Sequence, residues 1–596
     1  MEPGIFYKNR ISNLETELKK LNQKKLSFGW LRFGSIAAII VTFYVLWSLG
    51  FLYVAFVSIV LLIIFVRLLY ADLKNKAAID HVGKLIVINQ NELKFLDENY
   101  YGFPTGSEHI PGDHLYANDL DIFGKASLFQ FINRTESEMG SWQLAQYLQF
   151  PCEPKMIAER QNAVKELSNK TPWTQDLQAK GKEKKITFST KIRLQNWIEE
   201  PPVFSKFKPW KWLRYVLPAI IISVVVAYMF DAVPSGIFYL ALLLFAAIAY
   251  QINKYVAPVH DRLSKIAAEI ETLSASIEHI ENATFESDLL KQLQSALFHQ
   301  NKNVSDDITR LRKLLDKLDL RYNLVISAPL NILLLWNLQQ MLDLEKWKSE
   351  QQQNIEKWFT TLGHIEALNS FGILHFNEPD WAFPTIIPDY FFIEGKEIGH
   401  PLIAKSKRID NYIGIKHDGE LMVVTGSNMA GKSTYLRSVG VNVILAMAGA
   451  PACARELKVS HVQVISSMRI TDNLAESTST FYAELKKLKT VIERVNAGEK
   501  VFILLDEILR GTNSLDRHTG SVALIKQLIK HHAAAIIATH DLELAKMKDE
   551  FPESIINYHF DVQVSNDELY FDYKLKPGVC NSLNASILMK KIGIEL

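Results

Sequence analysis

The stretch Gly426-Ser427-Asn428-Met429-Ala430-Gly431-Lys432-Ser433 decides the fold of the carboxyl-terminal part of the chain. It follows the apolar run Leu421-Met422-Val423-Val424 and precedes an apolar, helix-forming segment. The glycines let the backbone wrap so that successive N–H groups point at phosphate oxygens, and the following helix adds the partial positive charge of its amino end. The spacing G-x-x-x-x-G-K-[ST] predicts a phosphate-binding loop, with Lys432 at the β- and γ-phosphates and Ser433 on Mg²⁺.

Two later apolar runs end in polar residues suited to the same site. Val501-Phe502-Ile503-Leu504-Leu505 is followed by Asp506-Glu507. Adjacent carboxylates are unfavourable unless a cation is near, so we expect Asp506 to bind Mg²⁺ and Glu507 to polarise the attacking water. Ala535-Ile536-Ile537-Ala538 leads to His540, which could sense the γ-phosphate or serve a structural role. Such runs alternate with helices from about residue 385, which predicts an α/β nucleotide-binding domain.

Two long apolar blocks lie in the amino-terminal half. Residues 33–66 contain no charged residue, and residues 215–253 contain only Asp231. One bilayer crossing needs about 20 apolar residues, so each block predicts a hairpin of two membrane helices. Trp47-Ser48-Leu49-Gly50 and Asp231-Ala232-Val233-Pro234-Ser235-Gly236 are the expected turns. The alternative is a pair of buried core hairpins.

The basic residues predict the orientation of these hairpins. Lys and Arg flank both blocks, and neither expected turn contains either residue. By the positive-inside rule the hydrophilic parts face the cytoplasm, as in a multi-pass protein of the cell inner membrane. A third uncharged stretch, residues 324–342, contains Pro329 and several amides, and we expect it to form a buried core helix.

Composition excludes some classes of protein. The 596 residues carry a net charge of +1, which excludes a globally basic nucleic-acid binder but not a local basic groove. The three cysteines are far apart in sequence, so they predict neither a paired zinc site nor a disulfide framework.

Several motifs resemble those of the MutS family of mismatch-repair ATPases. The segment from Thr425 to Arg437 resembles the family's phosphate loop, with Asn-Met inside it and Tyr-Leu-Arg after it. Asp506 to Thr512 resembles Asp-Glu-x-Gly-Arg-Gly-Thr, with Leu509 in place of a glycine. Further matches are Ala538-Thr539-His540, the Ser-Thr-Phe-x-x-Glu pattern from Ser479 to Glu484, weaker upstream segments at 121–164 and 362–368, and carboxyl-terminal segments at 571–578 and 591–594.

The resemblance implies an ABC-type P-loop ATPase that uses ATP and Mg²⁺. It assigns catalysis to Glu507, Lys432 and His540, and nucleotide binding to the loop from Gly426 to Thr434. It also implies a homodimer with composite ATP sites, in which Ser479 of one subunit contacts the γ-phosphate in the other.

The expected organisation combines this ATPase with the two membrane hairpins. An all-α core and lever region precedes the α/β domain. The expected segments are an amphipathic start (1–28), hairpin 1 (29–71), the first part of the core (72–205), hairpin 2 (206–254), the lever region (255–384) and the ATPase (385–596).

The resemblance also departs from the mismatch-reading members. Their mismatch-reading amino-terminal domain has no counterpart where the first hairpin stands, and residues 282–320 are the best candidate for a DNA clamp. We expect a membrane-anchored MutS-like ATPase whose dimer binds DNA, mismatched or branched, in an ATP-dependent way. The alternative is an ATPase switch that acts on a protein or lipid partner without DNA; a repair-protein partner is not identified by the sequence. A half-transporter is disfavoured, because no Leu-Ser-Gly-Gly-Gln signature is present.

Overall fold

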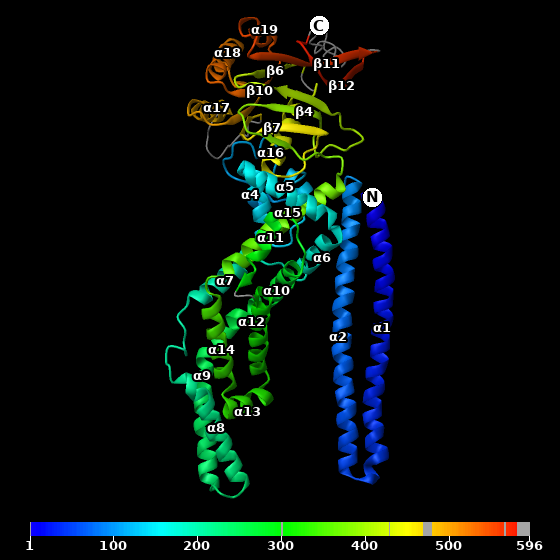
Figure 1. Ribbon diagram of the computed structural model, residues 1–596, viewed down its shortest axis with the longest axis vertical. Coiled ribbons are helices and arrows are strands. Elements are labelled where there is room, and N and C mark those ends of the chain that lie inside the picture. Colours follow the sequence, from blue (N-terminus) through cyan, green and yellow to red (C-terminus); the bar gives the residue numbers. More distant parts are fainter. Residues whose placement is uncertain (1, 300–301, 428–429, 469–479, 566–567, 581–596) are drawn as a thin grey trace. The chain divides into compact units, whose positions relative to one another are not determined.

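The computed structural model describes residues 2–299, 302–427, 430–468, 480–565 and 568–580. The chain forms two compact units, Met1–Tyr100 with Pro172–Lys185, and Tyr101–Thr171 with Ile186–Leu596. Largely helical segments precede a mixed α/β carboxyl-terminal region, as the sequence predicts (Figure 1).

The first unit is built on two long helices that pack along each other, α1 (Pro3–Leu46) and α2 (Phe51–Leu96). The chain reverses through a 3₁₀ turn (Trp47–Leu49) and Gly50, at the predicted turn. Gly50 has φ +107°, a conformation that side chains with a Cβ rarely adopt. The expected boundaries at residues 28 and 71 are not helix ends, because a change from polar to apolar side chains alters the surroundings of a helix and not its backbone preference.

Helix α6 (Thr171–Gly181) supplies the rest of this unit's core. The side-chain amides of Asn89 and Gln175 pair through two hydrogen bonds of 2.9 and 3.1 Å, and both residues are buried. The neighbouring apolar contacts join Leu14 of α1, Leu85 of α2 and Ala179 of α6. Residues 72–100 and 172–185 therefore belong with residues 1–71, rather than with a core segment that starts at residue 72.

The second unit begins with a helical region that contains the second hairpin. Leu263, Ile266, Ile270, Leu273, Ile277 and Ile280 are all buried, as their helical spacing predicts. A two-stranded ribbon, β1 (Phe298–His299) with β2 (Lys302–Asn303), interrupts the helices. The helices are α3 (Leu128–Ile132), α4 (Glu138–Gln149), α5 (Pro154–Asn169), α7 (Phe188–Glu199), α8 (Trp210–Met229), α9 (Ser235–Leu263), α10 (Ala267–Glu281), α11 (Asp288–Ser295), α12 (Val304–Asp319), α13 (Leu324–Leu334), α14 (Trp336–Gln351) and α15 (Ile355–Asn377).

Four helices in the described part of the chain are long and apolar enough to cross a membrane. They are α1, α2, α8 and the continuous run Ser235–Glu281. Only 6–11% of the residues in their most apolar windows are buried. This exposed apolar surface contradicts the alternative of two buried core hairpins, in which those side chains would be covered by protein.

The uncharged stretch 324–342 is only partly the buried helix that the sequence predicts. It forms two helices, α13 and α14, bent by 75° at Leu335, which has φ +47°. Leu338 and Met341 of α14 are buried, whereas Val325 and Ile326 of α13 are exposed. The expectation of one buried helix is therefore wrong, because the backbone turns at a leucine whose left-handed conformation has no signal in the composition.

The α/β region holds two sheets. The larger has the order β12-β11-β6-β10-β9-β8, in which β12 alone is antiparallel to its neighbour, and the smaller has the order β3-β7-β4-β5. Strand β10 pairs with β6 on one side and with β9 on the other. The strands are β3 (Thr385–Ile387), β4 (Ile393–Ile398), β5 (Asn411–Ile415), β6 (Leu421–Thr425), β7 (Glu456–Ser460), β8 (Gln463–Ser467), β9 (Val501–Asp506), β10 (Ala534–Thr539), β11 (Ile555–Ser565) and β12 (Glu568–Pro577). The helices are α16 (Lys432–Ala448), α17 (Thr480–Asn496), α18 (Ser514–Lys530) and α19 (Leu542–Glu550).

Helices α4 and α15 approach closely where each carries a glycine. A Cβ at Gly140 would lie 2.1 Å from Glu366 Oε2, and a Cβ at Gly363 would lie 3.0 Å from the Met139 carbonyl oxygen. The Ser137 hydroxyl donates to Glu366 Oε2 at 2.6 Å, and burial raises the pKa of Glu366 to about 7. This contact joins α15 to the helices that pack on α16.

We therefore expect Gly140→Ala to destabilise the protein. Overpacking costs about 1–3 kcal/mol, which corresponds to a fall of roughly 3 °C or more in the apparent Tm. Gly83→Ala is the control, since nothing lies within 4 Å of a Cβ at that helical position. Thermal unfolding of the detergent-solubilised variants, followed by tryptophan fluorescence, measures the difference. Equal Tm values for Gly140→Ala and the wild type would contradict the close packing.

Candidate active site

The predicted loop joins β6 to α16 and depends on its two glycines. Gly426 has φ +148° and Gly431 has φ +106°. A Cβ at Gly426 would lie 2.9 Å from the carbonyl oxygen of Phe560, and one at Gly431 would lie 3.0 Å from the Tyr573 ring. Both positions therefore require glycine for conformation and for space. Asn428 and Met429, also predicted to bind nucleotide, lie outside the described residues.

The ammonium group of Lys432 is buried inside this loop. It donates hydrogen bonds to the carbonyl oxygens of Gly426, at 2.7 Å, and of Ser427, at 3.0 Å. Its Nζ lies 4.0 Å from Glu507 Oε1. Burial lowers the pKa of Lys432, while the neighbouring Glu507 and Asp506 oppose that shift. An anion in the loop would supply the compensating charge that a buried ammonium needs.

Ser433 and Asp506 fit a Mg²⁺ ion. The Ser433 hydroxyl donates to Asp506 Oδ2 at 2.5 Å, whereas Asp506 Oδ1 is buried and has no hydrogen-bond partner among the described residues. Burial raises the pKa of Asp506, because a carboxylate charge is unfavourable away from water. In the described part of the chain no group of three or more His, Cys, Asp and Glu side chains could hold a metal ion. One carboxylate with a hydroxyl still suits Mg²⁺, which takes its other ligands from water and phosphates.

Glu507 and His540 meet beside this pair because β10 lies between β6 and β9. Glu507 Oε1 is 3.6 Å from His540 Nδ1, and Glu507 Oε2 is 3.1 Å from Arg510 Nε. The N–H of Glu507 donates to the Ala538 carbonyl oxygen at 2.9 Å, which ties the end of β9 to β10. The structure thus brings Lys432, Ser433, Asp506, Glu507 and His540 close together, and the role assigned to each stays a prediction.

The turn after Glu507 is held by Glu484 of α17. Leu509 has φ +61°, and its N–H donates to Glu484 Oε1 at 2.5 Å. A leucine in this conformation is strained, and the resemblance places a glycine at this position. Phe481, also of α17, packs closely against Gly511, since a Cβ added at Gly511 would lie 2.5 Å from the Cβ of Phe481. Ser479 lies outside the described residues.

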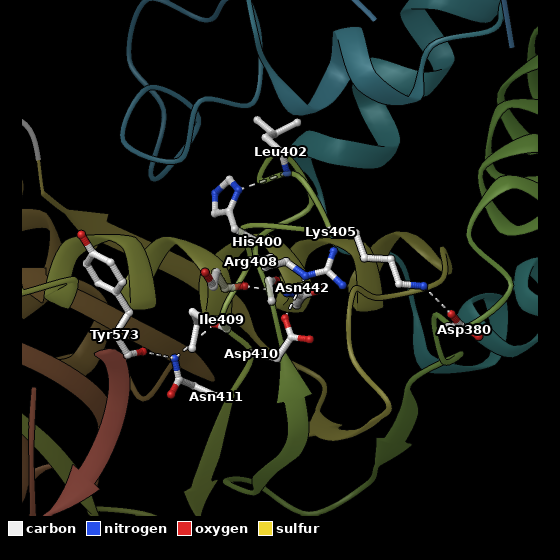
Figure 2. A network of polar contacts seen from close by, with 12 residues as sticks. Asp380, His400, Leu402, Lys405, Arg408, Ile409, Asp410, Asn411, Asn442 and Tyr573 are labelled. Atoms are coloured by element: carbon white, nitrogen blue, oxygen red, sulfur yellow. Dashed lines mark hydrogen bonds and ion pairs between the residues drawn. The ribbon is translucent and has the colours of Figure 1, made fainter. Parts of the chain in front are cut away.

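The other end of the cavity is lined by residues that sequence reasoning missed. The cavity measures about 370 Å³ and runs from Lys432 and the exposed Thr434 to the segment before β5 and to β12. At that end Arg408 Nε pairs with Asp410 Oδ1 at 2.8 Å, and the Asn411 amide donates to the Tyr573 carbonyl oxygen at 3.0 Å (Figure 2). The available signal was that residues 400–411 lie shortly before β6 in the sequence. Nothing in the sequence indicated that Tyr573 would reach the cavity.

His400 is a buried, neutral member of this end of the cavity. Its Nδ1 accepts the N–H of Leu402 at 3.2 Å, and burial lowers its pKa to about 4 (Figure 2). This end of the cavity therefore combines the neutral imidazole and the apolar Ile409 with two cationic side chains, Lys407 and Arg408.

Comparisons with known proteins agree with this geometry. Residues 422–590 match the family model of MutS domain V. That region is a MutS domain V. The chain is 31% identical over 230 residues to the DNA mismatch repair protein MutS 2 of Halobacterium salinarum. The aligned part covers 37% of this chain and 25% of that protein. It is 31% identical over 238 residues to the DNA mismatch repair protein MutS of Persephonella marina, which covers 39% of this chain and 27% of that protein.

A further relative gives the same result. The chain is 32% identical over 225 residues to the DNA mismatch repair protein MutS of Aquifex pyrophilus, covering 37% of this chain and 26% of that protein. The matched part therefore spans about a quarter of the length of these curated relatives. The likeness applies to the MutS domain V, which carries every described residue of the predicted nucleotide site.

We expect Glu484 to act as a positioning residue for Glu507 in the MutS domain V. Glu484→Ala removes the acceptor that holds Leu509, so kcat for ATP should fall about tenfold or more while KM changes little. Glu484→Gln keeps an acceptor oxygen and should recover most of the loss. Glu493→Ala, at an exposed position of the same helix, is the control. Steady-state phosphate release measures these values; unchanged kcat in Glu484→Ala would contradict the role.

Proposed function

We propose that this chain is a Mg²⁺-dependent ATPase of the MutS type, anchored in a membrane. The observation that carries the ATPase proposal is the convergence of Lys432, Ser433, Asp506 and Glu507 at the carboxyl ends of β6 and β9. In open parallel sheets this edge is where ligands bind. The match to MutS domain V supports the same reaction.

Each residue has a separate role in the proposed reaction. Loop N–H groups and Lys432 bind the β- and γ-phosphates, and the end of the cavity lined by His400, Ile409 and Tyr573 takes the base and ribose. Ser433 and Asp506 hold Mg²⁺, which when bound neutralises charge on the phosphates. Glu507 orients the attacking water, and His540 and Arg510 hold the Glu507 carboxylate in place. The contribution of the protein is thus positioning and electrostatic stabilisation.

The anchoring proposal is supported by the four long apolar helices and by the basic residues beside them. Their exposed apolar surface would be unfavourable in water over so many residues. The hydrophilic parts would face the cytoplasm, as the distribution of Lys and Arg indicates. We further propose a dimer in which Ser479 of each subunit completes the other subunit's site, as the resemblance implies.

DNA is the first candidate for what this ATPase acts on. The relatives that match its MutS domain V are named DNA mismatch repair proteins. In this proposal ATP favours the closed dimer, since the nucleotide contacts both subunits, and hydrolysis removes that preference. The helices between the ATPase and the membrane would carry the change to mismatched or branched DNA.

A protein or lipid partner is the second candidate, favoured by the charges on α12. This helix was the best clamp candidate, but Arg310 pairs with Glu350 at 2.8 Å and Arg312 pairs with Glu271 at 2.7 Å. Cations that already have carboxylate partners attract phosphate less, and the helix buries its apolar face against protein. The described part of α12 therefore resembles a structural helix more than a DNA-binding one.

The proposed chemistry predicts that Glu507→Gln loses hydrolysis but retains ATP. Removing a group that activates water lowers the rate by about 100-fold or more. Lys432→Ala should lose both hydrolysis and binding. Glu553→Gln, an exposed carboxylate, serves as the control. Filter binding of radiolabelled ATP and phosphate release distinguish these cases. Hydrolysis by Glu507→Gln at the wild-type rate would contradict the assignment.

The two candidates for the target predict different responses to salt. DNA binding through several phosphate contacts should weaken about a thousandfold between low and moderate salt. It should also change when a non-hydrolysable ATP analogue is added. Fluorescence anisotropy with matched, mismatched and four-way junction DNA, using the detergent-solubilised protein, measures both effects. Binding without either response would reject DNA as the target and leave the second candidate.

A further inference from the structure

Helix α13 exposes apolar side chains at its amino end, whereas the side chains at its carboxyl end are half-buried. Its eleven residues carry no charge, and Val325 is 84% exposed. Among its residues whose side chains are described, Ser327 is buried, Ile326 and Pro329 are exposed like Val325, and the other six are half-buried. The helix is about 16 Å long at 1.5 Å per residue, so it is too short to cross the roughly 30 Å hydrocarbon core of a bilayer.

The position of α13 makes its apolar surface continuous with that of the second hairpin. It contacts both α8 and α9, and Figure 1 shows it beside them at the end of α12 and α14. At this level, polar contacts join the hairpin to α14. The Asn337 amide donates to Asn253 Oδ1 at 3.1 Å, and Arg214 Nε donates to Gln339 Oε1 at 2.7 Å. The hairpin turn at residues 230–234 lies at the far end of α8 and α9.

The residues around this level are those expected at a membrane surface. Trp and Tyr are enriched where headgroups meet hydrocarbon, and Lys and Arg are enriched on the cytoplasmic side. Five exposed aromatic residues and four basic residues lie here. The basic residues lie before α8, in its first turn or within α9. The full set is Trp212, Tyr215, Tyr250, Tyr255 and Tyr322, with Lys206, Lys208, Lys211 and Lys254.

We infer that α13 lies in the cytoplasmic interface of the lipid bilayer, beside the α8–α9 hairpin. Helices α12 and α14, which are joined through α13, then end on the lipid surface. The inference rests on the proposed anchoring, because it needs the hairpin to be inserted. Of the two partners in the second candidate, protein and lipid, it selects lipid.

The 75° bend at Leu335 fits this arrangement. It turns α13 away from the direction of α14, so that one helix can follow the membrane plane while the other leaves it. A helix that lies in the interface buries one apolar face in lipid, so it does not have to be long enough to cross the bilayer. A rotation of α12 and α14 during the ATPase cycle would then tilt or lift α13 at the membrane.

The test places an environment-sensitive NBD label at single introduced cysteines in the full-length protein, reconstituted in vesicles of phosphatidylcholine and phosphatidylglycerol. Cys152→Ser removes the most accessible of the native thiols. Val325→Cys reports on α13, Leu243→Cys on the hairpin, and Lys313→Cys on an exposed position of α12. Quenching is measured with aqueous iodide and with lipids that carry a nitroxide near the headgroup or deep in the chain.

The inference predicts that the label at residue 325 is quenched more by the shallow nitroxide than by the deep one. The label at residue 243 should be quenched by lipid nitroxides, and that at residue 313 by iodide alone.

If residue 325 behaves like residue 313 while residue 243 is in lipid, the inference fails and the anchoring stands. If residue 325 is shielded from every quencher, a protein or a second copy covers α13 and the inference fails. Iodide quenching at residue 243 would overturn the anchoring itself.

Discussion

The burial of one ammonium group beside two carboxylates is the constraint on which the rest of the site depends. Lys432 lies inside a loop of backbone carbonyl and N–H groups, and Asp506 and Glu507 lie at the end of the neighbouring part of the sheet. A buried charge without compensation would destabilise the fold by several kcal/mol. The strand order brings the opposite charges together, because β10 connects the strand of the loop to the strand of the carboxylates.

The same region is joined to the helices by specific polar contacts. Asp119 is buried and accepts hydrogen bonds from the Ser466 hydroxyl at 2.9 Å and from Lys487 at 3.1 Å, so it links the segment before α3 to β8 and α17. Asp121 lies 3.3 Å from Arg437 of α16. Residues of α16, β8 and α17 therefore contact the segment that leads into α3 and α4. These contacts are the physical route by which a nucleotide could bias the helical region.

The parts of the structure that the sequence predicts are those encoded in short, contiguous patterns. The loop, the carboxylate pair and His540 each follow an apolar run. Because these runs form parallel neighbouring strands, their carboxyl ends lie at the same edge of the sheet. The two hairpin turns were predictable from Gly50 and from the Asp231 to Gly236 segment, because backbone conformation there needs particular residues. The buried stripe from Leu263 to Ile280 follows from helical spacing alone.

The remaining features depend on contacts between distant segments. Tyr573 and Arg408 reach the cavity from opposite sides of the loop in sequence, and neither belongs to a local pattern. The bend at Leu335 and the left-handed Leu509 place leucines where composition would suggest glycine. The continuous helices through residues 28 and 71 show that a change in side-chain polarity does not mark a change in backbone structure.

The most direct test of the central claim is calorimetric titration of ATP into the purified protein, with and without Mg²⁺, for the wild type and Asp506→Asn. The account predicts one ATP per chain, tighter binding with Mg²⁺ in the wild type, and no gain from Mg²⁺ in Asp506→Asn, since the substitution removes the carboxylate that would hold the ion. Absence of saturable binding in the wild type, or an equal gain from Mg²⁺ in both proteins, would contradict it.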